Sequence, residues 1–183
     1  MGAFRFTGKS KKQLLWEANF LQQHHKPARH SSPSLFQEPP LQFSLPELKD
    51  DPVDDLYDEM EILGFTMSNP FALVEEEAYT YVLAANLHKY LGKCITTLVY
   101  FIDQKQVPTK TDKEMFFGTF LDRDLDWIDT VHFPKAASAY PLHSTGFYLV
   151  TGKVVEDFGV YSIEVGQMGK VGYKERSYGK HLV

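Results

Sequence analysis

From residue 93 onward, the chain alternates between short apolar runs and polar or glycine-containing breaks. The runs are rich in β-branched and aromatic residues, which is typical of β-strands. They read KCITTLVYFID (93–103), FFGTFL (116–121), WIDTVHF (127–133), GFYLVTGKVVED (146–157) and VYSIEVGQMGKV (160–171). A polar loop, QKQVPTKTDKE (104–114), separates the first two runs. The segment PKAASAYPLH (134–143) has little strand character and suits one or two helical turns.

Five strands at this spacing, with a short helical connection between the third and fourth, predict a small closed barrel. The expected fold class is mainly β: a five-stranded OB-type Greek-key barrel, preceded by short helices and a proline-rich linker. Gly118 and Gly152 lie inside predicted strands, where glycine marks a β-bulge or the tight coiling that closes a barrel.

The first half of the chain has helical and proline-rich patterns instead. Apolar residues recur at helical spacing in the basic N-terminal segment: Leu14, Ala18 and Leu21. A second helix is predicted to begin at Pro52, with Asp51 as N-cap, and to end at Gly64 in a left-handed C-cap. A further helix is expected near 84–91, whereas 78–83 fits either helix or strand.

These patterns divide the chain into one domain with appendages rather than two full domains, as suits 183 residues. Six prolines between positions 27 and 52 exclude a regular helix or central strand there. The expected segments are a basic helix at 1–26, a proline-rich linker at 27–50, a helical connector at 51–91, the OB-fold domain at 92–172 and a flexible tail at 173–183.

Charge is segregated along the chain, so the net charge of -5 describes no single surface. The net charge is +5 over residues 1–30, -10 over 47–77 and +1 over 88–183. No apolar run of about 18 residues and no signal-peptide pattern occurs. The single cysteine, Cys94, suits a reducing compartment. We therefore expect a soluble, cytoplasmic protein.

The aromatic residues of the second and third strands are the first candidates for binding. Phe116 and Phe117 point to opposite faces of a pleated strand, so one ring faces the interior and the other faces solvent. We favour Phe117 as the outward ring, beside Thr119, with Trp127 as a second exposed ring; the opposite pleat would expose Phe116. Exposed rings on these strands of an OB barrel stack on bases. The alternative is that the rings fill the core or pack against the acidic helix.

Basic residues near the same rim are candidates for phosphate contacts. The predicted loop between the first two strands carries three lysines, and Arg123 follows the second strand. The candidates are Lys105, Lys110, Lys113 and Arg123. Phosphate contacts of this kind release counterions, so the binding they support weakens as salt rises.

The case for catalysis or a metal site is weak. The turn DRDLD, followed by Asp129, resembles a calcium loop, but Arg123 interrupts it and no glycine occupies the required bend. Aspartates in a turn more simply cap their own backbone. The histidines and Cys94 lack zinc-ligand spacing, and no phosphate-cradling or hydrolase motif occurs. We expect no catalytic residue, no metal and no cofactor.

The blocks LHKYLGKCITTLVYFIDQKQVPTKTDKEMFFGTFLDRDLDWIDTVHFP and GFYLVTGKVVEDFGVYSIEV together resemble the C-terminal OB domain of the bacterial DNA polymerase III alpha subunit. The residues that fit the family's second and third strands are Met115, Phe117, Thr119, Phe120, Asp122, Phe133 and Pro134. Upstream, DDLYDEMEILGFTMSNPF is similar to the acidic helix before that domain. GAFRFTGKSKKQLLWEA is similar to the end of the preceding helix-hairpin-helix region.

The resemblance implies a non-catalytic module of a replicative DNA polymerase that binds single-stranded DNA. In the family the catalytic carboxylates belong to a palm domain far upstream, so we expect this chain not to be an enzyme by itself. It would be a fragment or a split-gene product whose partners are the remaining polymerase domains and other replisome subunits, with no membrane partner. The alternative is a protein-interaction barrel that docks a polymerase or clamp-loader partner.

Overall fold

The computed structural model of the protein describes residues 5–24, 51–75, 80–108, 114–142 and 144–176. The chain divides into two compact units, residues 1–55 and 56–183. The helices of the described residues are too short or too polar to span a lipid bilayer.

The first unit contains the predicted basic helix. The short 3-10 helix η1 (Arg5–Thr7) precedes α1 (Lys11–His24), which confirms a helix in this segment. A capping box begins α1: Gln13 N donates to Ser10 Oγ at 3.2 Å, and Ser10 N donates to Gln13 Oε1 at 3.0 Å. The motif Ser-x-x-Gln therefore positions the start of this helix.

The second helix, α2 (Pro52–Leu63), begins and ends where the sequence predicts. Its N-cap is Asp51, whose Oδ1 accepts a hydrogen bond from Val53 N at 2.9 Å. At the other end Gly64 has φ +81° and its N–H donates to Met60 O. A left-handed residue of this kind ends a helix, and glycine adopts it without strain.

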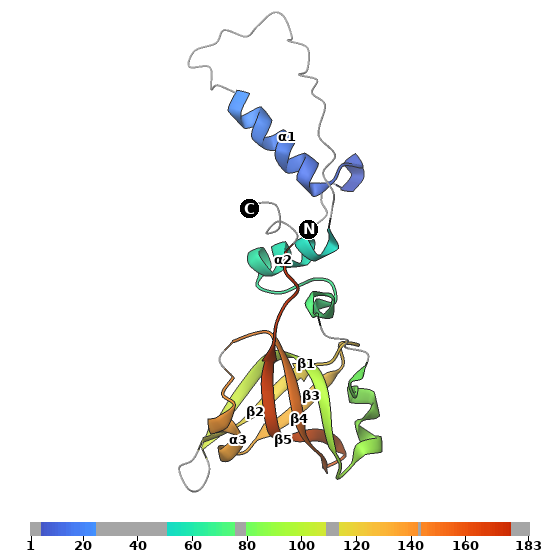
Figure 1. The fold of residues 1–183 in the computed structure, drawn as a ribbon, viewed down its shortest axis with the longest axis vertical. Coiled ribbons are helices and arrows are strands. Elements are labelled where there is room, and N and C mark those ends of the chain that lie inside the picture. The colour runs from blue at the N-terminus through green and yellow to red at the C-terminus, as the bar shows by residue number, and fades with distance from the viewer. Residues whose placement is uncertain (1–4, 25–50, 76–79, 109–113, 143, 177–183) are drawn as a thin grey trace, which may run out of the picture. The chain divides into compact units, whose positions relative to one another are not determined.

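Residues 56–183 contain a closed five-stranded barrel (Figure 1). Its elements are η2 (Pro70–Leu73), η4 (Ala84–Tyr90), β1 (Cys94–Pro108), β2 (Glu114–Leu121), β3 (Trp127–His132), α3 (Pro134–Ala139), β4 (Phe147–Asp157) and β5 (Val160–Val171). The strands close in the order β1-β2-β3-β5-β4, with β3 and β5 parallel and all other pairs antiparallel. With α3 between β3 and β4, this is the predicted OB-type Greek-key barrel.

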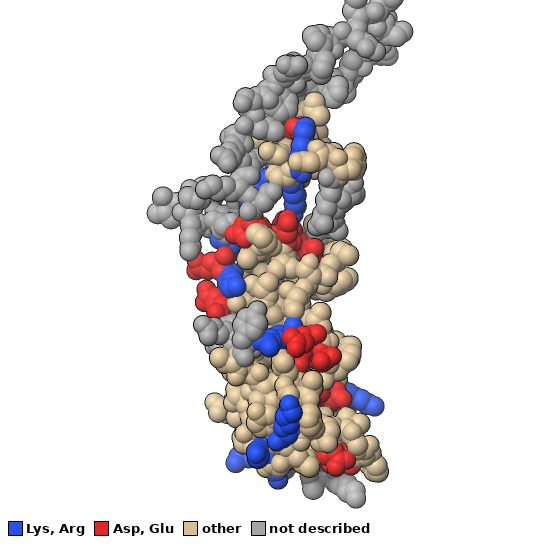
Figure 2. All heavy atoms as spheres, turned by 90° about the vertical axis from the view of Figure 1, so that its right-hand side faces the viewer, with Lys and Arg blue, Asp and Glu red and all other residues tan. Residues whose placement is uncertain are grey.

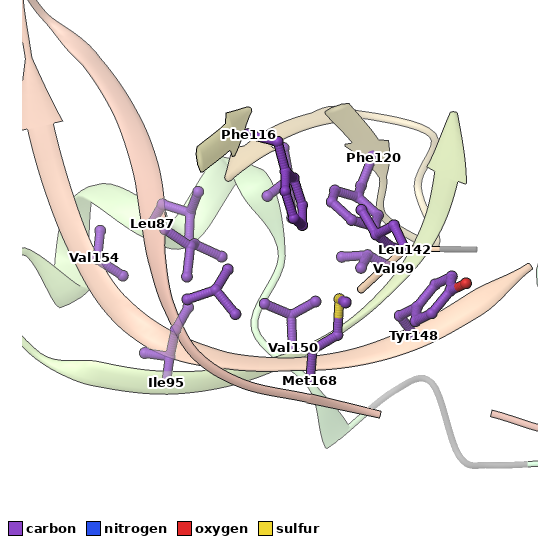
Figure 3. Packing of buried hydrophobic residues seen from close by; sticks show 13 residues of the cluster. Leu87, Ile95, Val99, Phe116, Phe120, Leu142, Tyr148, Val150, Val154 and Met168 are labelled. Atoms are coloured by element: carbon purple, nitrogen blue, oxygen red, sulfur yellow. The ribbon is translucent and has the colours of Figure 1, made fainter. Parts of the chain in front are cut away.

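The barrel interior is a continuous apolar core to which every strand and η4 contribute, as Figure 3 shows. Its members include Leu87, Ile95, Val99, Phe116, Phe120, Ile128, Leu142, Tyr148, Val150, Val154, Ile163, Val165 and Met168. The helix expected near 84–91 is the 3-10 helix η4. It buries one side chain, Leu87, against the barrel. The segment Tyr81–Leu83 before it is neither helix nor strand.

Strand β1 is longer than the sequence predicts. The polar residues Gln104–Pro108 were expected in a loop, but they pair with β2, with Lys105 opposite Phe117 and Pro108 opposite Glu114. The reason is that β1 pairs with both β4 and β2, so its second half needs strand geometry although its residues are polar. Lys105 therefore lies on a strand and not in a loop.

The two strand glycines serve different purposes. At Gly152 the β4–β5 register shifts, which confirms the predicted β-bulge, and a Cβ there would lie 2.3 Å from Glu164 O. At Gly118 the register is regular, so of the two predicted alternatives the bulge is absent there; the β1–β2 register shifts instead between Phe101 and Asp103. Instead, a Cβ at Gly118 would lie 2.7 Å from the Phe120 ring and 2.8 Å from Thr130 Oγ1, so interior crowding requires the glycine.

The segment after β5 is held by several contacts as far as Arg176. Tyr173 forms a β-bridge with Val74, and Lys174 N donates to Leu73 O at 2.7 Å. The Arg176 guanidinium lies 4.7 Å from the centre of the Tyr57 ring and pairs with Glu61 at 3.2 Å. The sequence predicts a flexible tail from 173 onward, whereas residues 173–176 are docked; the remainder, 177–183, lies outside the described residues.

Candidate nucleic-acid interface

The outward face of β2 and β3 carries the two aromatic rings that the sequence singled out. Phe117 is 43% exposed and Trp127 is 63% exposed, whereas Phe116 is 5% exposed and Phe120 is fully buried. The pleat therefore turns Phe116 inward and Phe117 outward, as we favoured. Both exposed rings lie on the outward face of the β2–β3 hairpin.

Strand register arranges this outward face in three rows. The first row holds Lys105, Phe117 and Val131, on β1, β2 and β3. The second row holds Asp103, Thr119 and Asp129 on the same strands. The third row holds Leu121 and Trp127.

The rows set the spacing of the candidate stacking rings. Phe117 and Leu121 are four residues apart on β2, and Trp127 lies opposite Leu121. Because a strand rises ~3.4 Å per residue, the Phe117 and Trp127 rows are roughly 14 Å apart. Two bases stacked on these rings would therefore belong to nucleotides that are not adjacent.

The aspartate-rich turn between β2 and β3 is built around Asp122. This fully buried carboxylate accepts hydrogen bonds from Asp124 N at 2.9 Å and Asp126 N at 3.0 Å through Oδ1, and from Ala84 N at 2.8 Å through Oδ2. Asp122 thus caps its own turn, as expected, and also holds the start of η4. Within the described ranges, no three His, Cys, Asp or Glu side chains gather closely enough to hold a metal ion.

Of the four basic candidates, the structure brings one to the face. Lys105 is exposed and pairs with Phe117 across β1 and β2. Arg123 is half-buried in the turn, with Nε 3.5 Å from Asp124 Oδ1, and its carbonyl accepts from Asn69 Nδ2 at 2.7 Å. Lys110 and Lys113 lie outside the described residues.

Charge on the barrel is mixed rather than basic. Residues 92–171 contain eight Lys or Arg and ten Asp or Glu. On the face drawn in Figure 2, blue and red side chains of residues 56–183 are interspersed among uncharged surface. Long-range electrostatic attraction of a polyanion is therefore weak, and contacts to bases must supply much of any affinity.

His132, on β3, points into the barrel and is fully buried. Its ring stacks on Phe116 at a centroid distance of 4.0 Å, and Nε2 lies 2.9 Å from Thr130 Oγ1. Since Thr130 Oγ1 donates to Gly118 O at 3.0 Å, the imidazole Nε2–H is the donor to Thr130. Burial lowers the pKa of His132 from 6.5 to about 4, so the ring is neutral and structural at pH 7.

The turn between β4 and β5 carries an exposed ring that the sequence analysis missed. Asp157 pairs with Val160, so Phe158 and Gly159 form a two-residue turn, with φ of +50° and +83°. Phe158 is 98% exposed, and a bulky residue in left-handed conformation is strained. In the sequence, Phe158 and Gly159 simply separate two strand-like runs, whereas in an OB barrel the loop between these strands borders the ligand face.

No protein-family model matches the sequence, and no curated protein matches it. Solved structures do match part of the chain. One is a candidate nucleic acid-binding lipoprotein from Klebsiella pneumoniae, with 19% identity over 48% of this chain and 77% of that chain and a TM-score of 0.37. Another is the second OB-fold domain of replication protein A from Methanococcus maripaludis, with 14% identity over 47% of this chain and 91% of that chain and a TM-score of 0.35. Likenesses this distant carry no functional argument, and the barrel is assigned here from its own strand order.

Proposed function

We propose that the OB-fold domain, residues 92–172, binds single-stranded nucleic acid on the outward face of β1, β2 and β3. The observation that carries this proposal is the pair of exposed rings, Phe117 and Trp127, on the strands of a closed OB barrel. Each exposed ring can stack on one base, and stacking contributes roughly 1–3 kcal/mol per base with little sequence preference. Thr119, between the two ring positions on the face, provides a hydroxyl within the same surface.

Phosphate contacts play a smaller part in this proposal. Lys105 lies beside Phe117, and Lys110 and Lys113 belong to the connection that follows β1. Arg123 contributes least, because its side chain is half-buried beside Asp124. With few free cations and a net negative barrel, we expect modest affinity and a shallow salt dependence.

The biological setting that we propose is DNA replication. Its support is the sequence resemblance to the region from the helix-hairpin-helix to the OB domain of the bacterial DNA polymerase III alpha subunit. In this proposal the chain is a non-catalytic, cytoplasmic module that contacts single-stranded template and works with the remaining polymerase domains. The palm carboxylates of that family have no counterpart in these 183 residues.

A second candidate function is a protein-interaction barrel that docks a polymerase or clamp-loader subunit. The observation that favours it is apolar exposure beyond the two rings: Leu125 is 44% exposed, Val160 is 57% exposed and Phe158 is 98% exposed. Exposed apolar side chains near mixed charge also suit a protein partner.

Fluorescence anisotropy with labelled oligothymidine over a salt series tests the first proposal. We expect binding at low salt that weakens as salt rises, and a loss of about tenfold or more in the double variant Phe117→Leu/Trp127→Leu. Leucine keeps apolar bulk but removes the ring, so stacking is lost while apolar docking is largely retained. Full oligothymidine binding by the leucine variant would refute stacking, and no binding by the unaltered chain at low salt would favour the docking barrel.

A further inference from the structure

The middle row of the β1–β2–β3 face carries carboxylates where a nucleic-acid surface would ordinarily carry cations. Asp103 and Asp129 are both exposed, with Thr119 between them in register. This row lies between the Phe117 row and the Trp127 row, roughly 7 Å from each at ~3.4 Å per residue. A single-stranded nucleic acid whose bases stack on both rings would pass directly over this row.

The geometry prepares Asp129 to accept hydrogen bonds. Thr119 Oγ1 donates to Asp129 Oδ1 at 3.3 Å, which holds the carboxylate against β2. Among the residues that the structure describes, no donor binds the second oxygen, Oδ2. An ionised carboxylate has about four acceptor positions and no donor, so most of its capacity faces solvent. Asp103 also accepts one hydrogen bond, but from its own strand: Gln104 N donates to Asp103 Oδ1 at 2.8 Å.

The two carboxylates of this row also restrict the orientation in which a single-stranded nucleic acid can bind. Phosphate oxygens are anionic, so a phosphodiester backbone over Asp103 and Asp129 would be repelled. The bases must therefore turn toward the sheet while the phosphodiester backbone stays away from the two carboxylates of the middle row. The edges of bases that lie between the two stacking rings would then meet acceptor-only side chains.

We propose that Asp129, positioned by Thr119, reads base edges and makes this face prefer guanine over thymine; this inference rests on the proposed single-strand binding. Guanine presents the N1–H and N2–H₂ donors side by side, which match the two oxygens of one carboxylate. Cytosine offers one amino group. Thymine offers a single N3–H between two carbonyl oxygens, both of which repel a carboxylate. Bases splayed from a single strand expose this Watson–Crick edge to side chains.

Labelled 12-mers test the inference: dT12, alternating dT-dG and alternating dT-dC, each titrated against the full chain at one low salt concentration. Alternation limits association between guanines. We expect the dT-dG oligomer to bind at least about fivefold tighter than dT12, with dT-dC between them. In Asp129→Asn we expect the three affinities to fall within about twofold of one another, because the amide also donates to thymine carbonyls.

Glu164→Gln is the matched control. Glu164 lies outward on β5, opposite Val131 in the first row, and its substitution removes the same charge without touching the middle row. We expect this substitution to raise the affinity for all three oligomers by a similar factor and to keep the preference for guanine. Thermal unfolding would verify that both variants fold.

Two outcomes overturn the inference in distinguishable ways. If the unaltered chain binds all three oligomers equally, or if Asp129→Asn changes all three by one common factor, base reading by Asp129 is wrong while single-strand binding stands. If the unaltered chain binds none of them, the proposed function fails and the base-reading role fails with it.

Discussion

The two faces of the β2–β3 hairpin both carry aromatic residues, but these residues are buried on one face and exposed on the other. On the inner face Phe116, Phe120 and His132 are buried and packed against one another and the core. On the outer face Phe117 and Trp127 are exposed, with an aspartate and a threonine between their rows. An aromatic ring on this hairpin therefore stabilises the fold or remains available for a ligand, depending only on its position in the pleat.

Truncating one ring on each face gives the largest difference. Phe120→Ala removes a fully buried side chain, and we expect the free energy of unfolding to fall by about 3–5 kcal/mol. Phe117→Ala removes a half-exposed ring, and we expect a fall of less than about 1 kcal/mol. Urea denaturation of both variants measures the contrast. Equal losses would mean that the outer ring also belongs to the core, which would remove it from the proposed interface.

The inner face also contains the group that should make stability depend on pH. His132 has a folded pKa of about 4, below its ordinary value of 6.5, because burial disfavours the imidazolium. Above pH 6.5 the ring is neutral in both states. As the pH falls below 6.5, His132 binds a proton in the unfolded chain but stays neutral in the folded chain. The free energy of unfolding therefore declines until about pH 4. We expect a loss of up to ~2 kcal/mol between pH 6.5 and 5.

Urea denaturation at several pH values, for the unaltered chain and for His132→Gln, measures this loss. Glutamine cannot titrate, so the variant should lose the component that His132 contributes between pH 6.5 and 5. His88→Gln is the matched control, because it makes the same substitution at an exposed position on η4. A profile that is the same in His132→Gln and the unaltered chain would assign the pH dependence to other groups.

The contrast between the faces also explains what the sequence could and could not predict. The barrel was predictable, because strand-like runs, turn residues and the helical connection are local patterns. The phase of β2 was open, because Phe116 and Phe117 are adjacent and identical. In the structure Gly118 faces inward, where Thr130 and Phe120 leave no room for a Cβ. The contact with Thr130 comes from another strand, so the sequence of β2 alone does not reveal it.

Other features depended on partners far along the chain. Asp122 looks like the other aspartates of its turn, and it is distinguished by Ala84 N, which lies 38 residues upstream. The second half of β1 is polar and looks like a loop, and its strand geometry comes from pairing with β2. In the sequence Phe158 only separates two strand-like runs, and its exposure becomes visible only in the folded barrel.

The smallest expected effect concerns Phe158, which resembles the outer rings in exposure but differs from them in backbone. With φ +50° and 98% exposure, its ring strains the turn and contributes little burial. Asparagine tolerates this conformation and suits a two-residue hairpin turn before glycine, so Phe158→Asn should raise the free energy of unfolding by up to about 1 kcal/mol. Urea denaturation measures the gain in stability, and fluorescence anisotropy with oligothymidine measures whether the same variant binds more weakly. A more stable variant with weaker binding would extend the interface to the β4–β5 turn, whereas a more stable variant with unchanged binding would confine it to the face of β1, β2 and β3.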